Sequence, residues 1–145
     1  MTGTVYLIPI QGHTKNLPHP QVVVIELDKE CVLVPAFGAD GQEVNDLAAA
    51  LSRLHGPQTD IFVELDNMKH VSFRPGFTGK RAKWIVARAL KMTKKDVSLQ
   101  RVIGTMDPEG LAKITAGLLS YARQQPALFS PHLVKKLRKL VEKRN

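Results

Sequence analysis

The residues best suited to chemistry lie in a short polar stretch, Gly12 to Pro20, between two apolar segments. It holds two of the five histidines, His13 and His19, together with Lys15. Histidine has an ordinary pKa of about 6.5, so it can give or take a proton near neutral pH. A loop with this content can supply an acid, a base and a cation, and functional groups are often placed on loops.

Short apolar segments on both sides of this loop predict the strands that position it. Thr4–Ile10, Gln21–Leu27 and Cys31–Phe37 are rich in β-branched residues and are too short for ordinary helices. The second and third segments are separated by Asp28-Lys29-Glu30, a spacing that suits a hairpin. The first third of the chain is therefore predicted to be a β-meander.

The rest of the chain combines helices with short strands. Apolar spacing predicts a helix over Glu43–His55, strands over Asp60–Asp66, Lys69–Phe73 and Val97–Ile103, a helix from Asp107 to about Arg123, and a last helix after Ser130-Pro131. Residues 83–92 fit either a helix or a strand. Asp107 and Pro108 are a typical N-cap and first-turn proline. The last helix has an apolar side and a basic side, formed by Lys135, Lys136, Arg138, Lys139, Lys143 and Arg144.

Short strands with inserted and appended helices predict a mainly β protein of the α+β class, built on a small antiparallel sheet or barrel. We expect one domain over residues 1–125, with a C-terminal basic helix over 126–145 that packs on it or extends from it. No apolar run has the length needed to cross a bilayer, and the N-terminus lacks the pattern of a signal peptide. A cytoplasmic protein without membrane association is therefore expected.

Lysine and arginine outnumber aspartate and glutamate by 21 to 13, which gives a formal net charge of +8. Such an excess favours a polyanionic partner such as RNA or DNA, although an acidic protein fits equally well. Cys31 is the only cysteine, so an intramolecular disulfide is excluded. His55 and His70 match no ligand spacing, and we expect neither a metal site nor a cofactor.

The order of these motifs resembles that of the PemK/MazF toxins. In that family a Gly-His pair, a short span ending in proline and an apolar strand follow one another; here the sequence reads GHTKNLPHP and then QVVVIEL. Val34-Pro35, the segment ELDNMKHV at 64–71, and a closing helix after Gly104-Thr105-Met106-Asp107 come in the same order. The resemblance covers roughly residues 4 to 123, with gaps.

The resemblance implies an SH3-like barrel that forms a homodimer. It also implies the toxin of a type II toxin-antitoxin system, a metal-independent endoribonuclease that cleaves single-stranded RNA and is inhibited by a small acidic antitoxin. Residue by residue, Gly12, His13 and Pro20 match the first motif. Asp66 matches a later acid of the family, and Lys69 matches the basic residue that follows it.

Three positions depart from the family pattern. His19 replaces the arginine before the proline, Phe37 replaces a polar residue and is expected to face His19, and Glu64 stands where some members have a catalytic arginine. Cleavage of RNA without a metal needs a base for the 2′-hydroxyl, an acid for the leaving oxygen and a cation for the phosphorane. We predict that His13 and His19, with Asp66, carry out the cut.

The predicted RNA contacts are five basic residues in loops or at strand ends: Lys15, Lys69, Arg74, Lys80 and Arg81. Gly76 and Gly79, in the loop from Arg74 to Lys80, are similar in spacing to the loop of KH domains, but a plain turn is the default interpretation.

Other interpretations stay open at this point. Loop histidines are often exposed spectators, Asp66 could close a hairpin through an Asx turn, and the basic helix could be a solvated face. The chain could also be a non-catalytic member of the same fold that binds nucleic acid or a protein. A gyrase inhibitor similar to CcdB is a further alternative, although its terminal tryptophan and glycine pattern is missing here.

Overall fold

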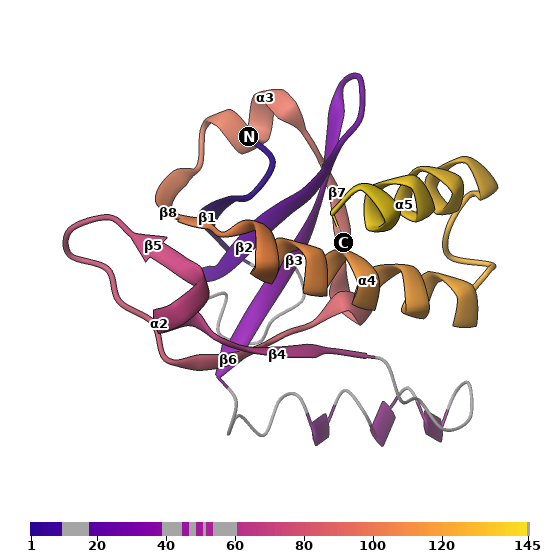
Figure 1. Cartoon of the computed structure of the whole chain (residues 1–145), viewed down its shortest axis with the longest axis horizontal. Coiled ribbons are helices and arrows are strands. Elements are labelled where there is room, and N and C mark those ends of the chain that lie inside the picture. The colour runs from indigo at the N-terminus through magenta and orange to yellow at the C-terminus, as the bar shows by residue number, and fades with distance from the viewer. Residues whose placement is uncertain (10–17, 39–44, 47–48, 51, 54–60, 145) are drawn as a thin grey trace.

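The computed structural model describes residues 1–9, 18–38, 45–46, 49–50, 52–53 and 61–144. A curled sheet forms the body of the molecule, and helices cover it (Figure 1). In chain order the elements are β1 (Thr4–Pro9), β2 (Pro18–Glu26), β3 (Glu30–Gly38), β4 (Val63–Asp66), α2 (Asn67–His70), β5 (Val71–Phe73), β6 (Arg81–Trp84), the 3-10 turn η1 (Val86–Arg88), β7 (Leu90–Thr93), α3 (Lys94–Ser98), β8 (Arg101–Met106), α4 (Pro108–Gln124) and α5 (Pro131–Arg144). The predicted α+β class, a small barrel-like antiparallel sheet with appended helices, is confirmed.

The sheet has the strand order β4-β6-β3-β2-β1-β8-β5, and every pairing in it is antiparallel. β3 has two neighbours on one edge, because Ala36–Gly38 pairs with β6 while Glu30–Leu33 pairs with β7. The two end strands, β4 and β5, are joined directly by α2. The sheet therefore curls into a half-barrel whose ends are brought together by this one turn of helix.

The predicted β-meander is confirmed as β1, β2 and β3. The middle of β2 is buried on both faces, because Val22 and Val24 belong to one core and Val23 to a second. This explains its unbroken apolar run, since only a strand that is covered on one face needs polar residues in alternation. Tyr6 and Leu33 lie in the same smaller core as Val23.

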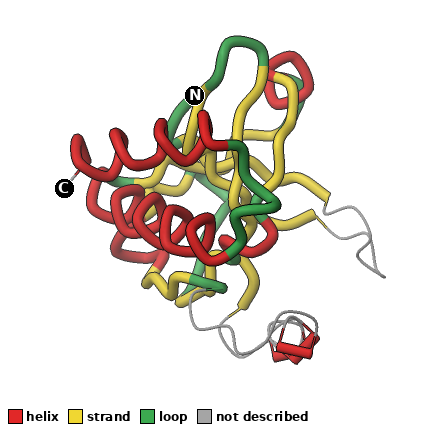
Figure 2. Tube along the Cα trace, turned by 90° about the vertical axis from the view of Figure 1, so that its right-hand side faces the viewer, coloured by secondary structure: helices red, strands yellow, loops and turns green. Residues whose placement is uncertain are grey.

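The larger core lies between the sheet and the two long helices, α4 and α5, which Figure 2 shows side by side on one face. Leu118 of α4 and Leu137 of α5 are both fully buried in it. Asp107 caps α4 as predicted, and Ser130 Oγ accepts a hydrogen bond of 3.2 Å from the Leu133 N–H at the start of α5. The two predicted C-terminal helices are therefore confirmed, and their start signals have the expected geometry.

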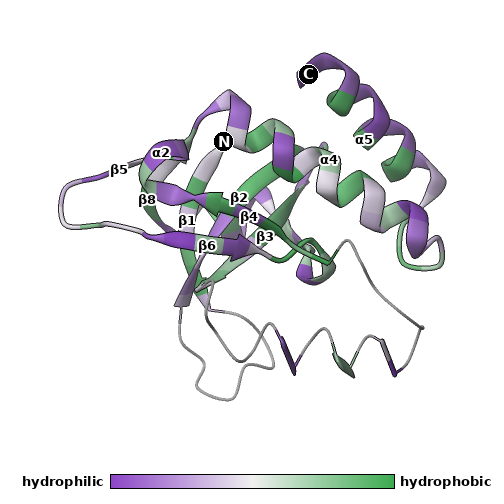
Figure 3. Cartoon of the chain, turned by 60° about the horizontal axis from the view of Figure 1, so that its bottom comes forward, coloured by the Kyte–Doolittle hydropathy of each residue, from purple (hydrophilic) through white to green (hydrophobic). Residues whose placement is uncertain are grey.

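The cations of α5 are not all directed to solvent. Lys136 Nζ donates to the Glu26 carbonyl at 2.8 Å, and Arg144 donates to Thr115 Oγ1 at 2.7 Å. Figure 3 shows the mixture of hydrophilic and hydrophobic residues along this helix. In the described part of the chain, no helix combines the length and apolar character that a membrane crossing requires.

Several predicted boundaries are wrong. Lys69 and His70 belong to α2 and not to a strand, and β4 and β5 do not pair, so the alternative of a hairpin closed at Asp66 does not hold. The strand predicted over Val97–Ile103 begins only at Arg101, because residues up to Ser98 form α3. β4 also starts later than predicted, at Val63 and not at Asp60. Residues 83–92 are divided among the end of β6, η1 and the start of β7. The helix predicted near 43–55 falls mainly outside the described residues.

Candidate functional site

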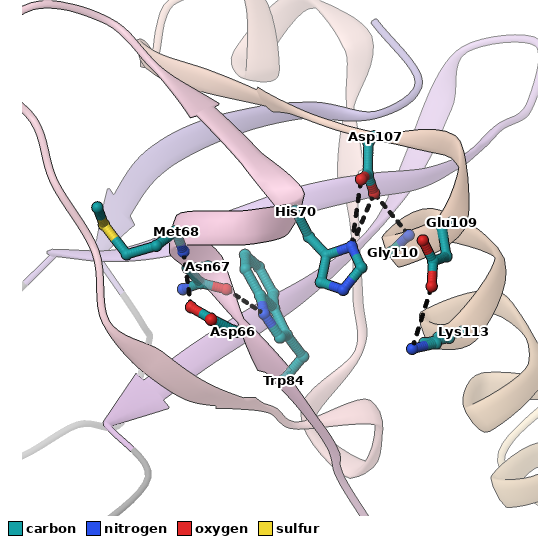
Figure 4. Close-up of polar contacts among 9 residues, drawn as sticks. All are labelled: Asp66, Asn67, Met68, His70, Trp84, Asp107, Glu109, Gly110 and Lys113. Carbon is teal, nitrogen blue, oxygen red and sulfur yellow. Dashed lines mark hydrogen bonds and ion pairs between the residues drawn. The ribbon is translucent and has the colours of Figure 1, made fainter.

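The junction between the two ends of the sheet is fixed by polar contacts of α2 (Figure 4). Asp66 accepts a hydrogen bond from the Met68 N–H at 3.1 Å and so caps this short helix. Asn67 accepts a bond of 3.0 Å from the indole N–H of Trp84 on β6, and both side chains are buried. A buried indole N–H needs a partner, so this bond fixes the position of α2 against β6.

On its other side α2 is linked to the start of α4. His70 Nδ1 lies 3.1 and 3.2 Å from the two carboxylate oxygens of Asp107, and the His70 carbonyl accepts from the Asp107 N–H at 2.7 Å. Asp107 also accepts from the Gly110 N–H at 2.7 Å. The His70 side chain is only 4% exposed. Because a carboxylate is purely an acceptor, Nδ1 carries the proton and the second ring nitrogen of a neutral His70 is left as an acceptor.

The environment of Asp107 favours its ionised form. Burial acts to raise the pKa of its carboxyl group, but the hydrogen bonds from Gly110 and His70 outweigh burial and leave the pKa below its usual range. The position of Asp107 at the N-terminus of α4 also suits a negative charge. This charge orients the imidazole of His70, an arrangement that many enzymes use for a general base.

The same cluster is the one group of possible metal ligands among the described residues. His70, Asp107 and Glu109 could each offer one atom, and these atoms lie within 4.8 Å of one another. However, Asp107 is already engaged by His70 and by the start of α4, and Glu109 lies 3.5 Å from Lys113 Nζ. As arranged, the cluster is a hydrogen-bonded link between helices, and its ligand atoms are not free to converge on an ion.

Exposed cations surround α2 and the loop between β5 and β6. We call them the α2–β6 basic surface, and its members are Lys69, Arg74, Lys80, Arg81 and Arg101. Four of them were predicted from the sequence as RNA contacts, and the structure places all four in this region. Arg81 Nε lies 3.3 Å from Glu64 Oε2, so one cation of the surface is partly neutralised. The strand β6 at its centre is mainly hydrophilic in Figure 3.

The β5–β6 loop is anchored at three points. The Arg74 N–H donates to the Ile103 carbonyl at 2.9 Å, and Thr78 Oγ1 lies 3.7 Å from the sulfur of Met68 on α2. At the third point the Arg101 guanidinium stacks 4.7 Å from the centre of the Phe77 ring. These contacts hold the cations of the loop beside those of α2 and β8.

His19 lies apart from this surface, near the start of β2. Its Nδ1 atom is 3.2 Å from the Ala36 carbonyl, and its ring stacks against Phe37 with centroids 4.5 Å apart. The expected approach of Phe37 to His19 is therefore confirmed. Because a carbonyl only accepts, this contact requires that Nδ1 carry the proton. The other ring nitrogen, Nε2, is buried, so a substrate would reach it only after a local opening.

The predicted catalytic residues are not gathered at one point in the described part of the chain. β3 and β6 lie between the strands of His19 and Asp66, and three strand spacings amount to as much as about 14 Å. His13 and Lys15 lie outside the described residues. Asp66 is exposed and lies opposite Arg81 in the β4–β6 ladder, at the border of the α2–β6 basic surface.

Sequence reasoning missed the His70–Asp107 pair and Arg101. Asp107 was recognised only as a helix cap, and nothing in the local pattern connects it with a histidine that precedes it by 37 residues. The sequence pattern also predicts a strand over Lys69–Phe73, which places His70 in a strand and away from Asp107. One usable signal was present: an N-cap carboxylate accepts a second hydrogen bond readily, and a histidine is a suitable donor.

The sequence matches no protein-family model and no curated protein. The resemblance to PemK/MazF toxins therefore rests on the short motifs quoted above, and the roles it implies remain predictions.

Proposed function

We propose that this protein binds single-stranded RNA through the α2–β6 basic surface. The observation that carries the proposal is the grouping of five exposed cations around one anchored loop, whose half-buried Phe77 ring contacts Arg101. Sites for single-stranded nucleic acid usually combine cations along the path of the nucleic-acid backbone with an aromatic side chain. The cations neutralise the phosphates, and a base stacks on the aromatic ring. Opposing charges are present as well: Glu64 and Asp66 on β4 lie opposite Lys83 and Arg81, and Asp107 lies near Lys69.

A binding assay with labelled single-stranded RNA tests this proposal. We expect the double variant Lys80→Glu and Arg81→Glu to weaken binding at least tenfold and to reduce its dependence on salt, because fewer phosphate contacts release fewer counterions. The double variant Lys95→Glu and Lys139→Glu is the matched control, since it makes the same charge change at two exposed lysines, on α3 and α5, that lie outside the surface. Equal loss in the two double variants would show that overall charge, and not this surface, binds RNA.

A second candidate function is RNA cleavage without a metal, as the resemblance implies. The specific observation in its favour is that Ala36 and Phe37 hold the ring of His19 in one orientation, although a local opening is needed before RNA can reach its buried Nε2 atom. In this proposal His13 and His19 exchange protons with the RNA, and Asp66 assists beside the cations that hold the phosphate. The small half-barrel with appended helices agrees with the fold that the resemblance implies, but many activities share one fold.

Incubation of the purified protein with mixed single-stranded RNA in EDTA separates cleavage from binding alone. Cleavage that is lost in a folded His13→Ala variant and kept in His132→Ala would support the catalytic assignment. His132 is a suitable control because it is exposed on α5. Retained binding with no cleavage would instead identify a non-catalytic RNA-binding module.

The biological role proposed with this activity is that of a cytoplasmic, homodimeric toxin inhibited by a small acidic antitoxin. The net charge of +8 supports an acidic partner, because opposite charges accelerate and orient association. Growth arrest on expression, relieved by co-expression of a small acidic protein encoded beside it, is the expected result. Expression without any effect on growth would contradict this role.

A further inference from the structure

An apolar groove of about 420 Å³ opens between the end of α4, the α4–α5 connection and β7. We call it the β7 groove; residues that line it include Ala87, Ala89, Leu90, Tyr121, Leu128 and Phe129. Leu128 is 64% exposed, and Phe129 packs edge-on against Tyr121 with ring centroids 6.0 Å apart. Exposed apolar side chains around a concave surface are typical of sites that bind another molecule.

One wall of the β7 groove is an open strand edge. β7 pairs with β3 from Leu33↔Leu90 to Glu30↔Thr93, and no other strand pairs with it among the described residues. The Lys94 N–H donates to the Lys29 carbonyl at 2.9 Å, which sets the alternation of the ladder. The backbone groups of Leu90 and Met92 are thus directed to β3. Those of Lys91 and Thr93 are directed to the open edge, where an added strand could pair with them.

The charges at the β7 groove are positive. Lys91 lines it and is exposed, while Arg88 is exposed between Ala87 and Ala89, which also line it. Neither cation forms an ion pair with an acid in the described part of the chain. An acidic ligand would therefore find two available cations beside the strand edge.

We propose that the β7 groove binds an extended acidic segment of a partner protein. The segment adds as a strand to the open edge of β7, places its apolar side chains among Leu128 and Phe129, and directs its carboxylates to Arg88 and Lys91. Strand addition of this kind takes affinity from backbone hydrogen bonds and specificity from alternate side chains. Nucleic acid would leave the apolar lining unused. A second copy of this chain, paired through its own β7 edge, would bring its Arg88 and Lys91 close to the same two cations here.

Selection of peptides from a random display library on the purified protein tests the proposal. We expect the enriched peptides to alternate acidic with bulky apolar residues. For a synthetic peptide of the enriched sequence, Leu128→Asp and Lys91→Glu should each weaken binding roughly fivefold or more, because one removes an apolar contact and the other reverses a charge. Lys139→Glu, an equal charge change at an exposed site on α5, should leave binding unchanged.

Methylation of alternate backbone nitrogens in the same peptide tests strand addition directly. One of the two methylated series should lose binding and the other should keep it, because only alternate residues of an added strand donate to β7. Equal tolerance of both series, enrichment without acidic residues, or failure to enrich any peptide would overturn the proposal. Self-association of the chain that Leu128→Asp abolishes would also overturn it, since a second copy would then be the occupant. The variant with Lys80→Glu and Arg81→Glu should bind the enriched peptide as the wild type does, which separates the β7 groove from the α2–β6 basic surface.

Discussion

Removal of the Asp107 carboxylate should cost far more stability than removal of a comparable cap. Asp107 is both the N-cap of α4 and the acceptor for the buried His70, whereas Asp66 caps only the four-residue helix α2. Loss of a cap costs about 1 kcal/mol, and loss of a hydrogen bond to a charged group costs about 1.5 kcal/mol for a half-exposed acceptor such as this one. We therefore expect Asp107→Ala to lower the free energy of unfolding by about 2–3 kcal/mol, and Asp66→Ala by about 0.5 kcal/mol.

Asp107→Asn separates the two contributions. Asparagine caps a helix as well as aspartate does, so this variant keeps the bond to the Gly110 N–H and loses only the charge that faces His70. Its expected cost is about 1 kcal/mol. Urea unfolding of the wild type and the three variants, followed by far-ultraviolet circular dichroism, gives these differences directly.

The difference in free energy of unfolding between wild type and Asp107→Ala should also depend on pH in a defined direction. The pKa of Asp107 is lowered in the folded protein, so the unfolded state takes up the proton first as the solution is acidified. The stabilisation is present above the ordinary carboxyl pKa of about 3.9 and is lost as the pH falls through the lower folded value. The gap between wild type and Asp107→Ala should therefore be full at neutral pH and shrink as the pH falls below about 4. A cost for Asp107→Ala no greater than that for Asp66→Ala, or a gap that widens in acid, would refute this reasoning.

Three other perturbations test the packing around the same junction and the smaller core. A Cβ at Gly104 would come 2.7 Å from the Ser72 carbonyl oxygen, so Gly104→Ala should lower the free energy of unfolding by about 1–3 kcal/mol in urea titrations. Asn67→Ala leaves the indole N–H of Trp84 without its acceptor and should cost about 1–3 kcal/mol, much of which should disappear in a Trp84→Phe background. Cys31 is fully buried, so a thiol reagent should modify it in native protein only at the rate of opening, and at once in denaturant.

The sequence was most informative where local chemistry agrees with tertiary structure. The β2–β3 hairpin follows from two apolar runs around a polar turn, and α4 begins at Asp107-Pro108 because both residues favour a helix start wherever the chain places them. The sequence pattern of residues 83–92 fits both a helix and a strand, and this ambiguity has a physical cause. Trp84 closes a ladder in β6, Val86 begins a tight turn and Leu90 starts a new strand, so no single period could describe the segment.

The junction at α2 could not be predicted because its contacts join distant segments. Residues 69–73 read as a strand, but the Asp66 cap and the bond from Trp84 to Asn67 favour a helical turn there. The Trp84 side chain follows Asn67 by 17 residues, so no local spacing indicates the pair. Four of the predicted RNA-contact residues, Lys69, Arg74, Lys80 and Arg81, are exposed in one region, and their role in RNA binding stays a prediction. Their closeness was set by the loop contacts, which the sequence did not reveal.

The short length of α2 has a consequence for the shape of the whole sheet. Each of the other boundaries around the half-barrel is a hydrogen-bonded ladder, whereas β4 and β5 are connected through the four residues of α2. Four helical residues rise about 6 Å, so α2 acts as a spacer that limits how widely the two ends of the curled sheet can separate. An insertion or deletion within it would change the distance between β4 and β5. The aperture of the half-barrel is thus determined by chain length at one point, and by strand pairing everywhere else.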